Sequence, residues 1–260
     1  MVLQGDLYST ALDMDTAVIF VAANNFTKEP PRKVCYLLHG LQGRCDNFLY
    51  YTQLADLCRE YHCLFVLPDA QRSFYADMEH GGAYFTYLTQ ELPRTVANLF
   101  RVSEKPEDTV IMGASMGGYG ALKAALTCPE KYGFCAAFSP CCLDMQYYLS
   151  AGWRDGTDGD AFRRIFGDQL SRDFNAAFGT EIRYRPETDL LALAEKNANG
   201  PHPHILTLWG DQDIFRDSNR AFPEQMEALG WTVDGREMPG NHSWVFFNEA
   251  LKQALPLCLK

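Results

Sequence analysis

The sequence predicts one α/β domain over residues 1–260, with a mostly parallel, eight-stranded sheet covered by helices on both faces. Short, uninterrupted apolar runs alternate with segments of helical spacing, which is typical of parallel strands buried on both faces. The composition, 47% hydrophobic and 22% charged, is that of an ordinary globular protein. Because no internal repeat, low-complexity tract or linker divides the 260 residues, we expect a single domain.

Eight apolar runs account for the expected strands. The first two, at residues 2–9 and 16–23, have no helix between them, so we expect an antiparallel hairpin at an edge of the sheet. The remaining runs lie at residues 34–40, 63–70, 109–115, 134–141, 204–210 and 232–238.

Segments of helical spacing follow most of these strands. One opens at Asp46 or Asn47, both good N-cap residues. Another starts at about Tyr84 or Thr89 and ends at about Phe100. An amphipathic helix from Trp244 closes the chain. Residues 142–200 are rich in Asp, Gly and aromatics and break the rhythm, so we expect them to form an insertion above the sheet.

Charge and composition exclude several classes of partner. The net charge of −10 argues against nucleic acid, because a phosphate backbone would be repelled. The N-terminus lacks the basic start and long apolar core of a signal peptide, and no apolar stretch reaches the length of a membrane span. The nine cysteines are best explained as reduced thiols, although adjacent Cys141 and Cys142 leave a redox pair as an alternative. We therefore expect a cytoplasmic protein without a membrane partner, and leave open whether it forms a homo-oligomer.

Ser115 is the candidate nucleophile. It stands in Gly113-Ala114-Ser115-Met116-Gly117, a G-x-S-x-G pattern that follows an apolar strand and opens a helix. A tight strand-to-helix turn lifts the serine hydroxyl out of the sheet, and a Cβ at either flanking glycine would collide with the neighbouring backbone. The alternative is a phosphate-binding loop, but no Gly-Lys-Ser/Thr follows the glycines.

His242 is the candidate base for this serine, because a serine hydroxyl is a poor nucleophile without one. It lies in a loop between the last strand and the last helix, at the carboxyl edge of the sheet where Ser115 also emerges. The other histidines suit surface, capping or loop-shaping roles: His39, His62, His80, His202 and His204.

An acid is needed to orient the imidazole and stabilise its charged form. Strand 204–210 is followed by Asp211 and Asp213, and Asp217 lies slightly further on. A residue directly after the turn stays at the strand end, whereas one two positions later can point back towards the histidine loop. We therefore favour Asp213, with Asp217 in reserve; the alternative for this acidic cluster is a solvated loop or a weak cation site, although its spacing matches no calcium loop.

Two backbone N–H groups should stabilise the oxyanion of an acyl-transfer reaction. One belongs to Met116, directly after the nucleophile, and the other to Leu41, after the turn that Gly40 permits. We expect His39 to shape this loop rather than to act as a second base. No group of residues has metal-ligand spacing, so neither a metal nor a cofactor is expected.

Six stretches, read in order, resemble the esterase D / tributyrin esterase family of α/β-hydrolases: HGLQG, RSFYADM, ELP, GASMGGYGAL, GDQD and GNHSW. The similarity runs from about residue 30 to 250. It implies an α/β-hydrolase fold and a serine hydrolase of short acyl esters. By position it implies the triad Ser115, Asp213 and His242, with Leu41 and Met116 as oxyanion donors.

The resemblance further implies that Tyr75, Met78 and Trp244 line the substrate pocket. S-formylglutathione hydrolases of this family typically carry a cysteine shortly after the glycine of this loop. Here Gln42 and Gly43 follow Leu41 instead, which favours the tributyrin- and feruloyl-esterase branch. The sequence thus predicts a cofactor-free carboxylesterase acting on a small-molecule ester, from acetyl to butyryl and including aryl esters. The alternatives are an S-formylglutathione thioesterase, an acyltransferase to a sugar or lipid, and a catalytically silent binding module.

Overall fold

The computed structural model describes residues 1–24, 26, 31, 33–145, 157–179 and 185–259. For residues 157–166 it describes the backbone alone. One sheet of eight strands organises the chain, in the order β1-β2-β4-β3-β5-β6-β7-β8. The strands are β1 (Val2–Ser9), β2 (Met14–Val21), β3 (Lys33–Leu38), β4 (Cys63–Pro68), β5 (Thr109–Ala114), β6 (Phe134–Phe138), β7 (His204–Gly210) and β8 (Val233–Met238).

The pairing of the strands confirms the predicted fold class. β1 and β2 form an antiparallel hairpin at one edge, and β2 also pairs antiparallel with β4. All other neighbours in the sheet are parallel. The carboxyl ends of the parallel strands therefore share one edge, and the loops that leave it can meet.

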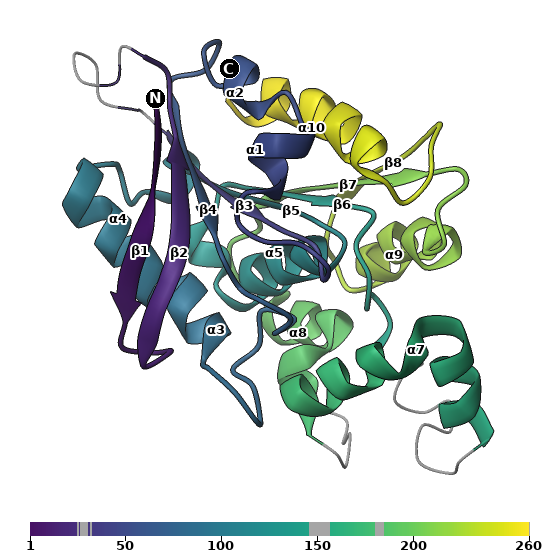
Figure 1. Cartoon of the computed structure of the whole chain (residues 1–260). Coiled ribbons are helices and arrows are strands. Elements are labelled where there is room, and N and C mark those ends of the chain that lie inside the picture. The colour runs from purple at the N-terminus through teal and green to yellow at the C-terminus, as the bar shows by residue number, and fades with distance from the viewer. Residues whose placement is uncertain (25, 27–30, 32, 146–156, 180–184, 260) are drawn as a thin grey trace.

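Helices cover both faces of the sheet (Figure 1). One face carries α1 (Asn47–Tyr51), α2 (Leu54–Leu57) and α10 (Trp244–Cys258). The other carries α3 (Tyr84–Thr86), the π-helical turn η1 (Tyr87–Glu91), α4 (Leu92–Phe100), α5 (Met116–Thr127), α8 (Leu190–Asn197) and α9 (Arg216–Ala228). Short 3₁₀ turns complete the chain at η2 (Pro106–Asp108), η3 (Pro129–Lys131) and η4 (Pro186–Thr188).

Two buried cores follow from the alternation of side chains along the strands. In β3, Val34, Tyr36 and Leu38 face the core beneath α4 and α5, whereas Cys35 and Leu37 face the core beneath α10. All nine cysteines, each in the described part of the chain, are free thiols, so Cys141 and Cys142 form no disulfide.

The helix predicted from residue 47 is divided into α1 and α2. At the break, the Thr52 hydroxyl bonds back to the Phe48 carbonyl, and the Gln53 amide donates to Asn248 Oδ1 at 2.8 Å. These bonds replace the helical ladder over one turn. The helix predicted to end at residue 100 contains the π-helical turn η1. This turn ends two residues before Pro93, which has no N–H to offer a regular ladder.

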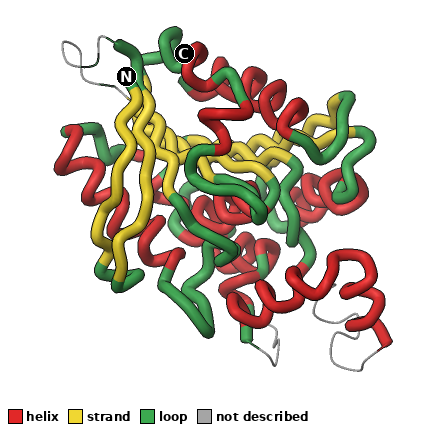
Figure 2. The backbone as a smooth tube through the Cα atoms, viewed as in Figure 1, coloured by secondary structure: helices red, strands yellow, loops and turns green. Residues whose placement is uncertain are grey.

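The segment predicted as an insertion has two parts in the described residues; residues 146–156 and 180–184 lie outside them. α7 (Thr157–Phe178) lies beyond the layers that cover the sheet, as the backbone trace shows (Figures 1 and 2). In contrast, α8 belongs to the layer beside α5, where Asn197 Nδ2 donates to Leu126 O at 2.8 Å. In the described chain, no helix is both long enough and apolar enough to cross a membrane.

Candidate active site

Ser115 lies in the turn between β5 and α5 in a strained backbone conformation, with φ 56° and ψ −117°. A Cβ built on Gly113 would lie 2.2 Å from the Gly117 carbonyl oxygen, and one on Gly117 would lie 2.1 Å from the Leu38 carbonyl oxygen. Neither position can therefore hold another residue without moving backbone. The predicted reason for these glycines, close crossing of backbone at the turn, is confirmed.

His242 and Asp213 form a hydrogen-bonded chain with this serine. His242 Nε2 lies 2.9 Å from Ser115 Oγ, and Nδ1 lies 2.8 Å from Asp213 Oδ2. Phe215 and Phe247 pack edge-on against the imidazole, with ring centroids 5.3 and 5.2 Å away. The loops after β5, β7 and β8 thus bring together three residues that are far apart in the sequence.

The environment of Asp213 favours its ionised form. Burial by itself raises the pKa of this carboxyl, but the hydrogen bond and electrostatic attraction between Asp213 and His242 oppose it, as does the Phe215 amide, which donates to Oδ1 at 2.8 Å. The pKa of Asp213 is lowered overall. A carboxylate with no solvent-exposed side-chain surface is thereby held against the imidazole.

Asp211 occupies a different place. It is exposed, and its Oδ1 accepts a hydrogen bond from the Gly240 amide at 2.9 Å, at the start of the loop that carries His242. Asp217 lies in the first turn of α9. Of the three acids, Asp213 alone is bonded to the imidazole.

The Leu41 loop lies beside Ser115. A Cβ on Gly40 would be 3.5 Å from Ser115 Cβ, and Leu41 lines the same cavity as Ser115. Among the described residues, neither the Leu41 amide nor the Met116 amide has a hydrogen-bond partner. Met116 begins α5, where helix amides are free to bind an anion.

His39 shapes this loop from beneath. Its Nδ1 donates to the Gly40 carbonyl at 2.8 Å, and its Nε2 accepts the Ala70 amide at 2.9 Å. Burial lowers the pKa of His39, which agrees with the neutral tautomer that these two bonds require.

A cavity of about 860 Å³ opens above Ser115 and His242. Its walls are mainly apolar, with Trp244 on one side, where the indole contacts the Tyr51 ring at a centroid distance of 5.4 Å. The apolar lining residues are Leu41, Tyr51, Phe74, Ala114, Cys141, Cys142, Leu170, Phe174, Ile214, Phe215, Trp244 and Phe247.

Tyr75 and Met78 do not line this cavity, contrary to the prediction. Tyr75 is fully buried, and its hydroxyl donates to the His39 carbonyl at 3.1 Å. Met78 lies against Gly81 and is not among the described residues that line the cavity. Phe74 lines the cavity instead, because left-handed backbone at residues 74 and 75 turns the two rings apart.

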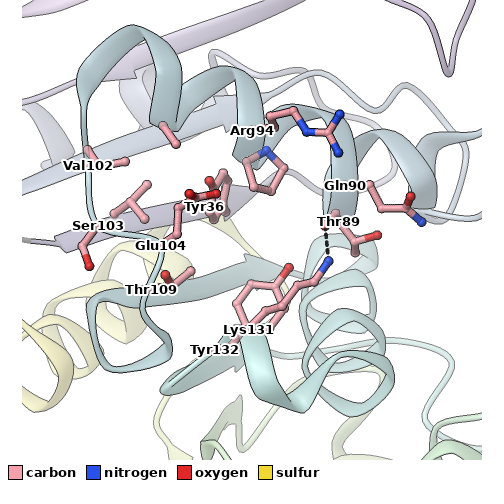
Figure 3. Close-up of a pocket in the computed structure, with 13 residues that line it drawn as sticks. Tyr36, Thr89, Gln90, Arg94, Val102, Ser103, Glu104, Thr109, Lys131 and Tyr132 are labelled. Carbon is pink, nitrogen blue, oxygen red and sulfur yellow. Dashed lines mark hydrogen bonds between the residues drawn. The ribbon is translucent and has the colours of Figure 1, made fainter.

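A second cavity, of about 420 Å³, lies between α4 and the amino ends of β3 and β5 (Figure 3). Lys131 Nζ reaches across it to the Thr89 carbonyl at 2.8 Å, while Tyr36 and Tyr132 form part of its wall. No histidine or cysteine is among its described lining residues, so it offers no counterpart to the Ser115–His242 pair.

The sheet order, the strand-to-helix turn at Ser115 and the histidine loop after the last strand define an α/β-hydrolase. The model of the Esterase family, described as "Putative esterase", matches residues 9–258. The chain belongs to this family and is an ester-hydrolysing enzyme.

Relatives and solved structures agree with this assignment. The chain is 27% identical to an acetyl esterase of Caldicellulosiruptor saccharolyticus over 264 residues, covering 97% of this chain and 96% of the relative. It is 30% identical to an S-formylglutathione hydrolase of Bos taurus over 218 residues, covering 75% and 69% of the two chains. The fluorophosphonate-binding serine hydrolase F of Staphylococcus aureus has a similar structure, with a TM-score of 0.79, 25% identity and coverage of 100% and 98%.

Proposed function

We propose that this enzyme is a serine carboxylesterase that hydrolyses short-chain acyl esters through an acyl-enzyme on Ser115. The observation that carries the proposal is the 2.9 Å contact between His242 Nε2 and the hydroxyl of a serine in a strained turn. A base within hydrogen-bond reach of a nucleophile, itself oriented by a buried carboxylate, is the arrangement that acyl transfer needs.

In the first half of the proposed reaction, Ser115 Oγ attacks the ester carbonyl while its proton passes to His242 Nε2. Asp213 holds Nδ1–H and stabilises the imidazolium. The imidazolium then gives its proton to the departing alkoxide, and the C–O bond breaks to leave an acyl-enzyme. In the second half, water loses a proton to His242 and attacks the acyl carbon. The bond between that carbon and Ser115 Oγ then breaks, the imidazolium returns its proton to Oγ, and the acid leaves.

The Leu41 and Met116 amides would stabilise the tetrahedral intermediate in both halves. Their N–H groups are unpaired in the described structure and flank the nucleophile. Oriented backbone donors of this kind act where negative charge develops and need no reorganisation during the reaction.

The cavity walls support an ester of an uncharged alcohol as substrate. Among its described lining residues, Arg72 is the only lysine, arginine, aspartate or glutamate, and its guanidinium is already paired with Asp173. Six aromatic rings favour small acyl and aryl groups: Tyr51, Phe74, Phe174, Phe215, Trp244 and Phe247. The relative named as an acetyl esterase points in the same direction.

S-formylglutathione is the second candidate substrate, because a relative at 30% identity carries the name of its hydrolase. Glutathione brings two carboxylates and an ammonium group, for which the described cavity wall offers no free charged partner. We therefore expect oxygen esters of acetyl to butyryl acids to give higher kcat/KM than S-formylglutathione or octanoyl esters. A panel of p-nitrophenyl acyl esters, methyl ferulate and S-formylglutathione measures this order; a long-chain or thioester optimum would reject it.

The nucleophile is tested by labelling with a fluorophosphonate probe and by Ser115→Ala. The probe should modify Ser115 alone, as peptide mass spectrometry would show, and the variant should keep less than about a hundredth of the wild-type rate on p-nitrophenyl acetate. Failure of the wild type to react would favour a catalytically silent binding module. Transfer of the acyl group to an added sugar or lipid, faster than hydrolysis, would favour an acyltransferase.

A further inference from the structure

The loop that carries Leu41 is held by donors from the segment that follows β4. The Tyr75 hydroxyl donates to the His39 carbonyl at 3.1 Å, and Arg72 Nη1 donates to the Leu41 carbonyl at 3.3 Å. Between them, the Gly40 carbonyl accepts His39 Nδ1, so each of these three consecutive carbonyls has a side-chain donor.

These bonds fix the two peptide planes that flank the Leu41 Cα. A trans peptide carries its C=O and N–H on opposite sides, so the position of the Gly40 oxygen sets the direction of the Leu41 N–H. The Arg72 bond fixes the next plane through the Leu41 oxygen. With both planes held, the backbone at Leu41 has little freedom to rotate, and its amide stays beside Ser115.

Arg72 is itself held from α7. Its Nε and Nη2 donate to Asp173 Oδ1 and Oδ2 at 2.8 and 2.6 Å. This bidentate pair fixes the orientation of the guanidinium. Asp173 is buried, and Gln169 Nε2 donates to its Oδ1 at 2.9 Å. One guanidinium thus joins a carboxylate of α7 to the carbonyl of Leu41, and it also lines the cavity.

The same end of α7 is packed on the segment after β4. The Phe174 ring contacts Phe74 with centroids 4.7 Å apart, and the backbone amides of Glu79 and His80 donate to carbonyls in the last turns of α7. The position of Asp173 therefore depends on how this helix is seated.

We propose that Arg72, held by Asp173, is a positioning residue for the Leu41 amide, so that the seating of α7 sets the geometry of oxyanion binding. The inference rests on the proposed function, in which this amide contacts the oxyanion. Loss of the guanidinium would release the plane after Leu41 and weaken the stabilisation of the transition state more than the binding of the ester.

The test compares Arg72→Met, Arg72→Lys and Asp173→Asn with wild type on p-nitrophenyl acetate. Loss of one oxyanion donor costs about 10²- to 10³-fold in kcat, so a loosened donor should cost roughly 10- to 100-fold, with KM changed less than about threefold. A trifluoromethyl ketone, which adds to the serine as an oxyanion, should lose affinity by a similar factor. Arg72→Lys and Asp173→Asn should lose less, because each keeps part of the fork.

Arg185→Met is the matched control. Arg185 Nη2 lies 2.7 Å from Oε2 of Glu79, a residue of the same segment after β4. In the described structure, Arg185 makes no hydrogen bond or ion pair with the Leu41 loop. It should change neither kcat nor ketone affinity by more than about twofold, and thermal unfolding should show that every variant is folded. Equal losses in Arg185→Met and Arg72→Met would overturn the proposal, because they would indicate general loosening.

Two further results would also overturn it. A raised KM with wild-type kcat in Arg72→Met would show that Arg72 contacts the substrate instead, and unchanged kcat and ketone affinity would show that it positions nothing. Ser115→Ala, measured alongside, separates the two proposals. An active Ser115→Ala enzyme would reject the proposed function and this inference together, whereas an inactive one beside a fully active Arg72→Met would reject this inference alone.

Discussion

Asp213→Asn should abolish most activity while leaving the fold intact, and the structure gives the reason. The Phe215 amide donates to Oδ1, so the remaining oxygen of an asparagine would stay on that side and its NH₂ would face His242 Nδ1. Two donors cannot face each other, so the imidazole would take the tautomer with its proton on Nε2. That nitrogen could then no longer accept the proton of Ser115.

The expected loss is large. The equivalent substitution in a well-studied serine protease lowers kcat by about 10⁴, which corresponds to about 5.5 kcal/mol of transition-state free energy. The melting temperature should change little, since the Phe215 hydrogen bond is kept and a buried charge is removed. The assay is kcat on p-nitrophenyl acetate, with thermal unfolding of the same samples.

Asp211→Asn is the matched control for this prediction. Asp211 is exposed, and among the described residues its side chain accepts only the Gly240 amide, which an asparagine oxygen can also accept. Its kcat should stay within about tenfold of wild type, as is usual for an exposed substitution. If Asp211→Asn lost more activity than Asp213→Asn on folded protein, the reasoning from the hydrogen-bonded chain would be refuted.

Three further predictions concern stability and cofactors. Burial lowers the pKa of Lys123 to about 8, below its value in an unfolded chain, so the contribution of Lys123 to stability should rise between about pH 8 and 10.4. Lys123→Met should therefore melt at a higher temperature than wild type at pH 7, and this difference should shrink as the pH rises; a difference independent of pH would reject the idea. Gly117→Ala should fail to fold or lose activity, because its Cβ would lie 2.1 Å from the Leu38 oxygen, whereas Gly5→Ala, with open space around it, should match wild type in thermal unfolding. Chelators should leave the esterase rate unchanged, since no group of three or more potential metal ligands lies within the described residues; a loss restored by added metal would contradict this.

Much of the fold could be predicted because its signals are local. Short apolar runs indicated the central strands, and the missing helix between the first two predicted strands indicated the antiparallel hairpin. Ser115 stands in a motif whose glycines have a steric reason, and His242 follows the last strand, where a loop must return to the same edge. These inferences need only the chain and the geometry of a parallel sheet.

Other features depend on contacts that are distant in sequence or on unusual backbone. Left-handed conformations at Phe74 and Tyr75 decide which ring enters the cavity, and no apolar pattern encodes them. The break between α1 and α2 depends on Asn248, almost two hundred residues away. The Arg72–Asp173 pair likewise joins residues 101 positions apart, so neither partner stands out in the sequence.

The strained backbone at Ser115 has an evolutionary consequence. A non-glycine residue held at φ 56° and ψ −117° costs on the order of 1–3 kcal/mol, which glycine would largely avoid. Under selection for stability alone, drift would therefore favour glycine at this position, and a gene freed from its chemical task would gain robustness by that single change. If Ser115 is the nucleophile proposed above, selection for catalysis would offset this standing cost in stability.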